Sequence, residues 1–259
     1  MTLRLVVAAL VGFMTLPTIV VIAVSFNPTA ILSFPPAGLS PRWYLNALTY
    51  PQFQRAAINS LVVTAGAVLL ALPIGTAAAL VLERGSLRAR NLWATLLLSP
   101  LVVPGVAAGL GFLILAAALG LLQSRIVLIV AHTALVLPFV VRSVWVSVKN
   151  LDPVLPLAAA SLGATPGRTF RRVTLPLLRP GLFAALLFAI IVSVNEFVVS
   201  LFISTRVSEI LPVAMFTYVV NYTDPTIAAL STLFIVATFL AVWVANRFLG
   251  LGAVFLHHR

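Results

Sequence analysis

The chain has 259 residues, of which 62% are hydrophobic and only 8% are charged, whereas a soluble globular domain carries about 25% charged residues. This composition excludes an ordinary soluble protein and indicates an integral membrane protein. The net charge of +11 could indicate nucleic-acid binding, but cationic residues beside membrane spans explain it better, because they collect on the cytoplasmic side. The absence of cysteine excludes disulfides and thiolate metal sites.

The first apolar run covers residues 5–26. A signal peptide has a core of about 7–15 apolar residues, so this longer run favours an uncleaved first transmembrane helix. Residues 27–55 contain several prolines and the aromatic pair Trp43 and Tyr44. They predict an external loop with a short interfacial helix from Pro41.

A transmembrane helix needs about 20 apolar residues, and six stretches of the chain meet this requirement. The spans are predicted at about residues 5–26, 56–82, 92–119, 126–147, 181–202 and 225–246. The predicted fold is therefore all-α, with six transmembrane helices in one domain that covers residues 1–259.

Several features of the spans and their connections carry structural expectations. Pro100 and Pro104 should kink the third span, and residues 204–224 read as a mixed loop. The sequences GTAAAL at 75–80 and GVAAGLG at 105–111 are rich in small residues, which allow membrane helices to approach closely.

The distribution of Lys and Arg predicts the orientation. With the N-terminus inside, four of the sixteen basic residues lie outside, namely Arg42, Arg55, Arg125 and Arg206. The remaining twelve (16 − 4) are cytoplasmic or close to that face, so both termini are predicted to be cytoplasmic. The C-terminal tail, with His257 and His258, is interpreted as a solvated segment.

The stretch from Asp152 to Pro180 interrupts the spans and faces the cytoplasm in this topology. Asp152 followed by Pro153 is typical of a helix start, and Gly163 is suited to a helix end. Thr165 followed by Pro166 is typical of a second helix start. The pattern predicts two short helices joined at Gly163, in a segment too short to be a domain and suited to binding another protein.

The sequence offers no catalytic or metal-binding constellation. It contains five acidic residues and three histidines, and it has no HExxH motif and no Walker A motif, since GATPG at 163–167 is not followed by Lys and Ser or Thr. We therefore expect no catalytic residues, no bound cofactor and no metal site. If ATP drives this protein, another subunit hydrolyses it.

Glu196, beside Asn195, is the most informative single residue, because a carboxylate inside a span costs about 3 kcal/mol on insertion scales. It either lines a pathway for a polar or cationic solute, or forms a structural pair, for example with an Arg. His132 with Thr133 is interpreted as a helix–helix hydrogen bond rather than a ligand, and Asn59 with Ser60 as interhelical packing.

Residues 157–181, LAAASLGATPGRTFRRVTLPLLRPG, resemble the EAA loop of bacterial binding-protein-dependent ABC importer permeases. Ala158, Ala159, Gly163 and the later Leu-Pro pair match the pattern, whereas Leu157 replaces its acidic residue. The resemblance extends to the second permease subunit of spermidine/putrescine-type importers. It is carried by SFN at 25–27, FPPAGLSPRWY at 34–44, INS at 58–60, AHTALVLPFVVR at 131–142, SVNEFVVSLF at 193–202 and SEILPVAMF at 208–216.

The resemblance implies the type I ABC importer permease fold in a bacterial inner membrane, with a cytoplasmic coupling-helix loop at 148–180 between the fourth and fifth helices. It implies as partners a homologous permease, two ATPase subunits that use ATP and Mg, and a soluble substrate-binding protein. The residues implied to couple to the ATPase are Ala158, Ala159, Ala160, Leu162, Gly163, Ala164, Arg168, Arg171 and Arg172. The arginines could pair with ATPase acids, or could reflect the positive-inside rule alone.

The resemblance implies a small polar solute, with a polyamine such as spermidine or putrescine first. Iron, phosphonate, opine or amino-acid-like compounds are the alternatives within the same importer class. A stand-alone secondary carrier or channel would work without an ATPase, and neither the length nor the lack of a repeat favours it. An intramembrane enzyme is disfavoured by the missing acid–base residues.

Overall fold

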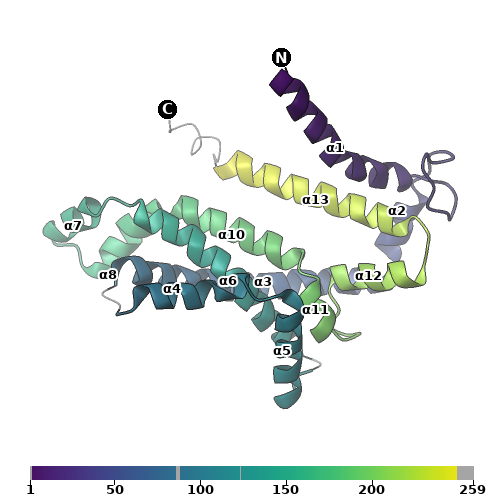
Figure 1. Ribbon diagram of the computed structural model, residues 1–259. Helices are drawn as coiled ribbons and strands as arrows, with labels where there is room; N and C mark the ends of the chain where they lie inside the picture. The colour runs from purple at the N-terminus through teal and green to yellow at the C-terminus, as the bar shows by residue number, and fades with distance from the viewer. Residues whose placement is uncertain (1, 86–87, 123, 250–259) are drawn as a thin grey trace. The chain divides into compact units, whose positions relative to one another are not determined.

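The computed structural model describes residues 2–85, 88–122 and 124–249, and within these ranges the regular structure is helical (Figure 1). The chain divides into two compact units, of which one comprises Met1–Ala57 and Val213–Arg259 and the other Ile58–Pro212. The longer helices are α1 (Thr2–Val24), α3 (Pro51–Arg84), α6 (Arg125–Lys149), α10 (Arg179–Val194) and α13 (Thr226–Leu249). The shorter α-helices are α2 (Arg42–Thr49), α4 (Arg90–Leu98), α5 (Gly105–Ala118), α7 (Val154–Ser161), α8 (Pro166–Thr169), α9 (Leu175–Leu177), α11 (Val198–Ile203) and α12 (Leu211–Asn221).

The core of the unit Ile58–Pro212 lies between α3, α6 and α10. A stripe of buried valines recurs every four residues along α6, at Val136, Val140, Val144 and Val148. This spacing places them on one helix face, where alanines of α3 and α10 pack against them. The valine stripe is therefore the surface that assembles these three helices.

Small residues bring the helices close together, as the sequence predicts. A Cβ atom on Gly75 of α3 would lie 2.6 Å from Cγ1 of Val140, and one on Gly181 of α10 would lie 2.1 Å from Oγ of Ser147. A Cβ on Gly109 of α5 would lie 2.6 Å from Cδ2 of Phe202 in α11. These glycines confirm the packing interpretation of the Gly- and Ala-rich runs.

The predicted third span is broken rather than gently kinked. Helix α4 continues into the short 3₁₀ helix η1 (Ser99–Leu101), and α5 begins after Pro104 with its axis bent by 95°. Proline lacks the amide N–H that would continue the helical hydrogen bonds, so the break lies where Pro100 and Pro104 predict it. Helix α5 then packs beside α11 (Figure 1).

The predicted fifth span is not continuous, so the expectation of one helix through residue 202 is wrong. Helix α10 ends at Val194, and α11 begins at Val198. The connection contains neither glycine nor proline, and polar side-chain contacts hold it, as described below. The expected mixed loop at 204–224 also contains a helix, α12, which begins beside Pro212, a position where proline is tolerated.

The unit formed by the two ends of the chain contains, as α2, the short helix that the sequence predicts from Pro41, and its location at a membrane interface stays a prediction. Trp43 donates a hydrogen bond from Nε1 to the carbonyl oxygen of Asn27 at 2.7 Å. Asn46 donates from Nδ2 to Oγ1 of Thr226 at 2.7 Å, which joins α2 to the start of α13. These bonds connect α2 to the preceding loop and to the last long helix.

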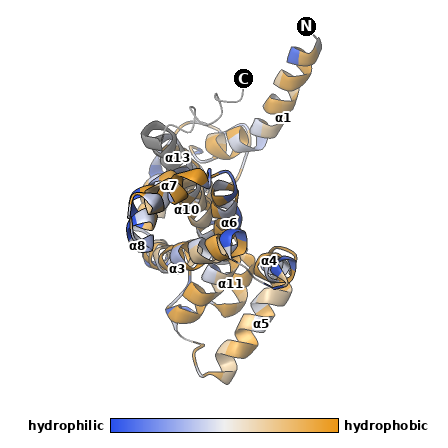
Figure 2. Ribbon diagram, turned by 90° about the vertical axis from the view of Figure 1, so that its left-hand side faces the viewer, coloured by the Kyte–Doolittle hydropathy of each residue, from blue (hydrophilic) through white to orange (hydrophobic). Residues whose placement is uncertain are grey.

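Three described helices are long and apolar enough to cross a membrane, namely α1, α3 and α6. Two bent pairs, α4–η1 with α5 and Pro166–Leu177 with α10, raise the number to five if each pair forms one span. Figure 2 shows the apolar character of α1 and α5 and the hydrophilic residues at α8. The six-span topology stays a prediction, and the tail with His257 and His258 lies outside the described residues.

Candidate functional site

The segment between α6 and α10 contains the two short helices that its sequence predicts. Asp152 accepts a hydrogen bond at Oδ1 from the backbone N–H of Val154 at 2.9 Å, which caps the start of α7. After Leu162, Gly163 adopts a φ of +82°. Thr165 is extended, and Pro166 begins α8.

The turn at Gly163 is a Schellman motif. The N–H of Ala164 donates to the carbonyl oxygen of Ala159 at 3.0 Å, and the N–H of Gly163 donates to that of Ala160 at 2.9 Å. These two bonds satisfy carbonyl groups that the end of α7 leaves without helical partners. Glycine suits the central position because L-residues rarely adopt a positive φ.

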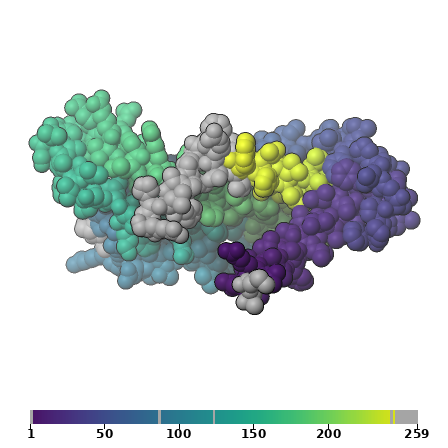
Figure 3. Space-filling model, turned by 90° about the horizontal axis from the view of Figure 1, so that it is seen from above, coloured from purple at the N-terminus to yellow at the C-terminus, as the bar shows by residue number. Residues whose placement is uncertain are grey.

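The coupling segment, which we define as residues 152–172 (teal to green in Figure 3), presents apolar side chains at its surface. Leu157 is 65% exposed, and Leu162 is 88% exposed. Most of the predicted coupling residues are exposed, and only Ala159 and Ala164 are half-buried. Exposed leucines on a short rigid element are typical of a surface that another protein covers.

The segment is also cationic. Arg168, Arg171 and Arg172 are exposed, and none of them forms an ion pair with an acid in the part of the chain that the structure describes. After α8, the backbone forms a π-helical turn over Phe170–Thr174, which carries Arg171 and Arg172. The segment therefore combines apolar side chains with uncompensated positive charge.

Glu196 lies in the break between α10 and α11. Its Oε1 accepts a hydrogen bond from the backbone N–H of Val199 at 2.8 Å, so the carboxylate caps the start of α11. Asn195 donates from Nδ2 to the carbonyl oxygen of Ile191 at 2.8 Å, at the end of α10. Both residues satisfy backbone groups that the break exposes, a role that the sequence does not reveal.

A buried polar network holds the other side of this break. His132 of α6 is 1% exposed, with Nδ1 2.8 Å from Oγ of Ser193 and Nε2 2.9 Å from Oγ of Ser200. Ser193 also lies 3.0 Å from Oγ1 of Thr64 on α3. The helix–helix bonding expected of His132 is confirmed, and its partners Ser193 and Ser200 carry no distinguishing sequence signal. The same expectation is wrong for Thr133, whose hydroxyl donates to the carbonyl oxygen of Ile129 within α6 at 2.7 Å.

Asn59 and Ser60 bind the segment that leads into α12. Asn59 donates from Nδ2 to the carbonyl oxygens of Val207 and Glu209, each at 2.9 Å. Ser60 accepts at Oγ from the N–H of Leu211 at 2.8 Å. Their structural role is confirmed, although their partners are backbone groups just before α12 and at its first residue rather than a neighbouring span. The INS and SEILP motifs are thus in direct contact.

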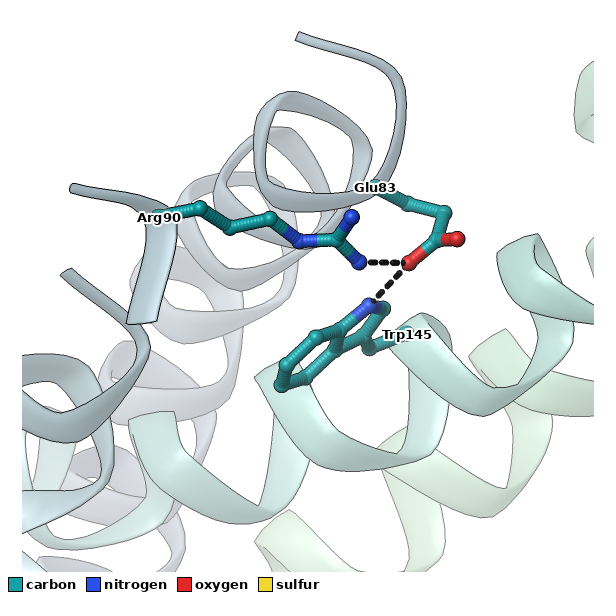
Figure 4. A network of polar contacts seen from close by, with 3 residues as sticks. All are labelled: Glu83, Arg90 and Trp145. Atoms are coloured by element: carbon teal, nitrogen blue, oxygen red, sulfur yellow. Dashed lines mark hydrogen bonds and ion pairs between the residues drawn. The ribbon is translucent and has the colours of Figure 1, made fainter. Parts of the chain in front are cut away.

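A second polar network joins α3, α4 and α6 (Figure 4). Glu83 accepts at Oε2 from Nη2 of Arg90 and, at 2.6 Å, from Nε1 of Trp145. The guanidinium carbon of Arg90 lies 5.7 Å from the centroid of the Trp145 ring, within the range of a cation–π contact. This network was missed at the sequence level because Glu83 and Trp145 are 62 positions apart.

Within the described ranges, no group of three or more His, Asp or Glu side chains is arranged to hold a metal ion. The sites therefore consist of an exposed coupling segment and buried networks that fix helix breaks and helix ends. Such an arrangement can transmit movement between helices.

Residues 71–249 match the family described as binding-protein-dependent transport system inner membrane component. The putrescine transport system permease protein PotI of Escherichia coli K12 is 33% identical, over 93% of this chain and 88% of that protein. The spermidine/putrescine permease PotC of the same strain is 27% identical, over 90% and 88%. The molybdenum permease ModB of Mycobacterium bovis is 34% identical, over 82% and 83%.

The fold resembles a chain in the crystal structure of a bacterial ABC transporter involved in the import of the acidic polysaccharide alginate. The TM-score is 0.72 and the alignment covers 96% of both chains, at 17% sequence identity. At this identity, the likeness bears on the fold alone. The family match and the full-length relatives, together with the helical architecture, show that this chain belongs to the binding-protein-dependent transport system inner membrane component family and is a multi-pass permease subunit of an ABC importer.

Proposed function

We propose that this permease imports a polyamine such as putrescine or spermidine, delivered by a soluble binding protein. It would act as one half of a permease heterodimer that two ATPase subunits drive. ATP and Mg would be bound by those subunits, and both termini of this chain would be cytoplasmic. The length of the match to the putrescine permease, 93% of this chain, supports the solute class.

The observation that carries the ATP-driven part of the proposal is the geometry of the coupling segment. Two short helices meet at a turn whose shape depends on Gly163 at a φ of +82°. The segment presents exposed leucines and three arginines that have no acidic partner among the residues that the structure describes. A rigid, amphipathic element of this size can enter a cleft on an ATPase and transmit its movement to α6 and α10, which flank it in the sequence.

Glu196 is proposed to contribute to a cationic pathway as well as to cap α11. Among the described residues, this carboxylate accepts at Oε1 from the N–H of Val199, so Oε2 can accept from a solute ammonium group. Discontinuous helices at mid-membrane commonly provide binding groups in transporters. The break at residues 195–197 interrupts the predicted fifth span.

A second solute class follows from the comparisons, because the molybdenum permease is as similar in identity as the putrescine permease. An oxyanion and a diamine carry opposite charges, so a single transport experiment separates them. The importer is reconstituted in vesicles with its ATPase, partner permease and binding protein. ATP-dependent uptake of labelled putrescine, spermidine and molybdate is then compared.

We expect uptake of a polyamine that requires both ATP and the binding protein. Uptake of molybdate alone would refute the polyamine assignment while leaving the importer class intact. Uptake that persists without the ATPase subunits would refute the coupled mechanism and favour a stand-alone carrier.

A further inference from the structure

An apolar groove of about 560 Å³ lies between α3 and α10. Leu72, Thr76 and Leu80 line it from α3. Their spacing of four residues places them on one face of the helix. Because the rise is about 1.5 Å per residue, the eight residues from Leu72 to Leu80 span about 12 Å. The groove is therefore long as well as apolar, and its volume falls within the range of about 300–1,000 Å³ typical of ligand sites.

The opposite wall of the groove carries a cationic side chain at one end and apolar side chains along the rest. Arg179, Leu182 and Leu186 line it from α10, and Arg179 is the first residue of that helix. The arginine therefore lies at one end of the wall and leucines follow it. Arg179 is exposed and has no ion-pair partner among the described residues. One end of the groove is cationic, and the remainder is apolar.

The neighbouring turn reinforces this charge. Phe170 and Leu175 also line the groove, and Arg171 and Arg172 lie between them in the sequence. Among the described residues, those that line the groove include no acidic side chain. A polyamine would be repelled here, so the groove is unsuited to the proposed solute.

A molecule with one anionic end and an apolar chain fits this pattern. Basic side chains between transmembrane helices bind anionic lipid headgroups, and each Lys or Arg near such a surface contributes about 1 kcal/mol. We propose that this groove binds an anionic phospholipid, with an acyl chain along Leu72–Leu80 and the phosphate at Arg179. Thr76 is a lining residue whose buried Oγ1 has no hydrogen-bond partner in the part of the chain that the structure describes.

Lipid retention tests the proposal without any transport measurement. The importer complex is purified, exposed to equal amounts of phosphatidylglycerol and phosphatidylcholine with identical acyl chains, and analysed by native mass spectrometry. The wild type should retain phosphatidylglycerol preferentially. Arg179→Gln should reduce this preference about fivefold, which corresponds to the loss of about 1 kcal/mol, whereas Arg179→Lys should keep most of it.

Two further variants separate the groove from general membrane charge. Ala77→Phe fills the groove from its edge, where Ala77 is an exposed lining residue, and should lower the retention of both lipids. Arg125→Gln removes a cation at the start of α6, away from the lining residues, and should change nothing. A preference that survives Arg179→Gln, or retention that survives Ala77→Phe, would overturn the proposal.

The occupant itself can be identified by cross-linking, because the chain has no cysteine. Ala77→Cys labelled with a benzophenone maleimide should give adducts with the mass of phosphatidylglycerol after illumination in mixed-lipid nanodiscs. Adducts formed mainly with the second permease chain would identify the groove as a subunit interface and refute lipid binding. Neither result depends on which solute is imported.

Discussion

Replacing Gly163 by valine should separate ATP hydrolysis from uptake. Gly163 has a φ of +82°, a conformation that costs an L-residue about 1–2 kcal/mol and is worse for a β-branched side chain. A Cβ at this position would meet no atom within 4 Å, so the penalty is conformational rather than steric. At 1.4 kcal/mol per factor of ten, the population of the native turn should fall about 5- to 30-fold.

The assay compares solute uptake with ATP hydrolysis in vesicles that contain the complete importer. Gly163→Val should lower the number of solute molecules imported per ATP, while gel filtration shows an intact complex. Gly163→Asn should retain more coupling, because asparagine tolerates the left-handed conformation better than valine does. Gly167→Val is the matched control, since this glycine lies in α8 with open space around its Cβ position and no positive φ.

Two outcomes would refute the reasoning about the turn. Normal coupling in Gly163→Val would show that the Schellman turn does not transmit force. Equal loss in Gly167→Val would show that the segment tolerates no larger residue anywhere, so that the φ of Gly163 is not the cause.

Three other substitutions test the polar contacts. Glu196→Gln keeps an acceptor for the N–H of Val199 but removes the charge. Uptake of a polyamine should therefore fall while the melting temperature stays unchanged. Normal uptake with a lower melting temperature would instead show that Glu196 has a purely structural role. Trp145→Phe removes the hydrogen bond to Glu83 and should destabilise the protein by about 1.5–3 kcal/mol, the range for bonds to charged groups; an unchanged denaturation midpoint would show that the network contributes nothing. His132→Ala leaves two buried serines without this partner. It should lower the free energy of unfolding by at least about 0.6 kcal/mol, the mean for membrane hydrogen bonds. Thr133→Ala is the control in thermal unfolding, because the Thr133 hydroxyl bonds within its own helix.

The coupling turn was predictable because its signals are local. Asp152, Gly163 and Pro166 each constrain the backbone at their own position or within two residues of it, and the structure shows a cap, a positive φ and a helix start there. The bend near Pro100 and Pro104 was predictable for the same reason. Backbone chemistry of this kind can be read without knowledge of the tertiary fold.

The break after Val194 was not predictable, because its causes lie elsewhere in the chain. No glycine or proline marks it, and its polar groups are satisfied by Glu196 locally and by His132 from α6. The contact between Glu83 and Trp145 is equally nonlocal. Polarity within a span thus predicts that a partner exists, whereas the identity of that partner depends on the packing of the helices.

Leu157 bears on how the coupling segment would bind the proposed ATPase subunit. The residue stands where the family pattern has an acid, and its side chain is 65% exposed. Full burial of a leucine contributes about 1.5–3 kcal/mol, so covering this exposed fraction should contribute about 1–2 kcal/mol. Leu157→Ser should therefore weaken association with the ATPase about 5- to 30-fold. Leu39→Ser, which alters an 83% exposed leucine outside the coupling segment, should have no effect.

Salt distinguishes the apolar contribution from the ionic one. The Debye length falls from about 10 Å at 0.1 M salt to about 3 Å at 1 M, so ion pairs made by Arg171 and Arg172 weaken as salt rises. The effect of making both arginines Glu should thus be large at low salt and small at high salt, as measured by retention of the ATPase on the immobilised complex. The effect of Leu157→Ser should persist at both, because apolar burial does not depend on charge screening. If high salt abolished the effect of Leu157→Ser, Leu157 would act only by positioning charged neighbours, and the apolar docking of this segment would be refuted.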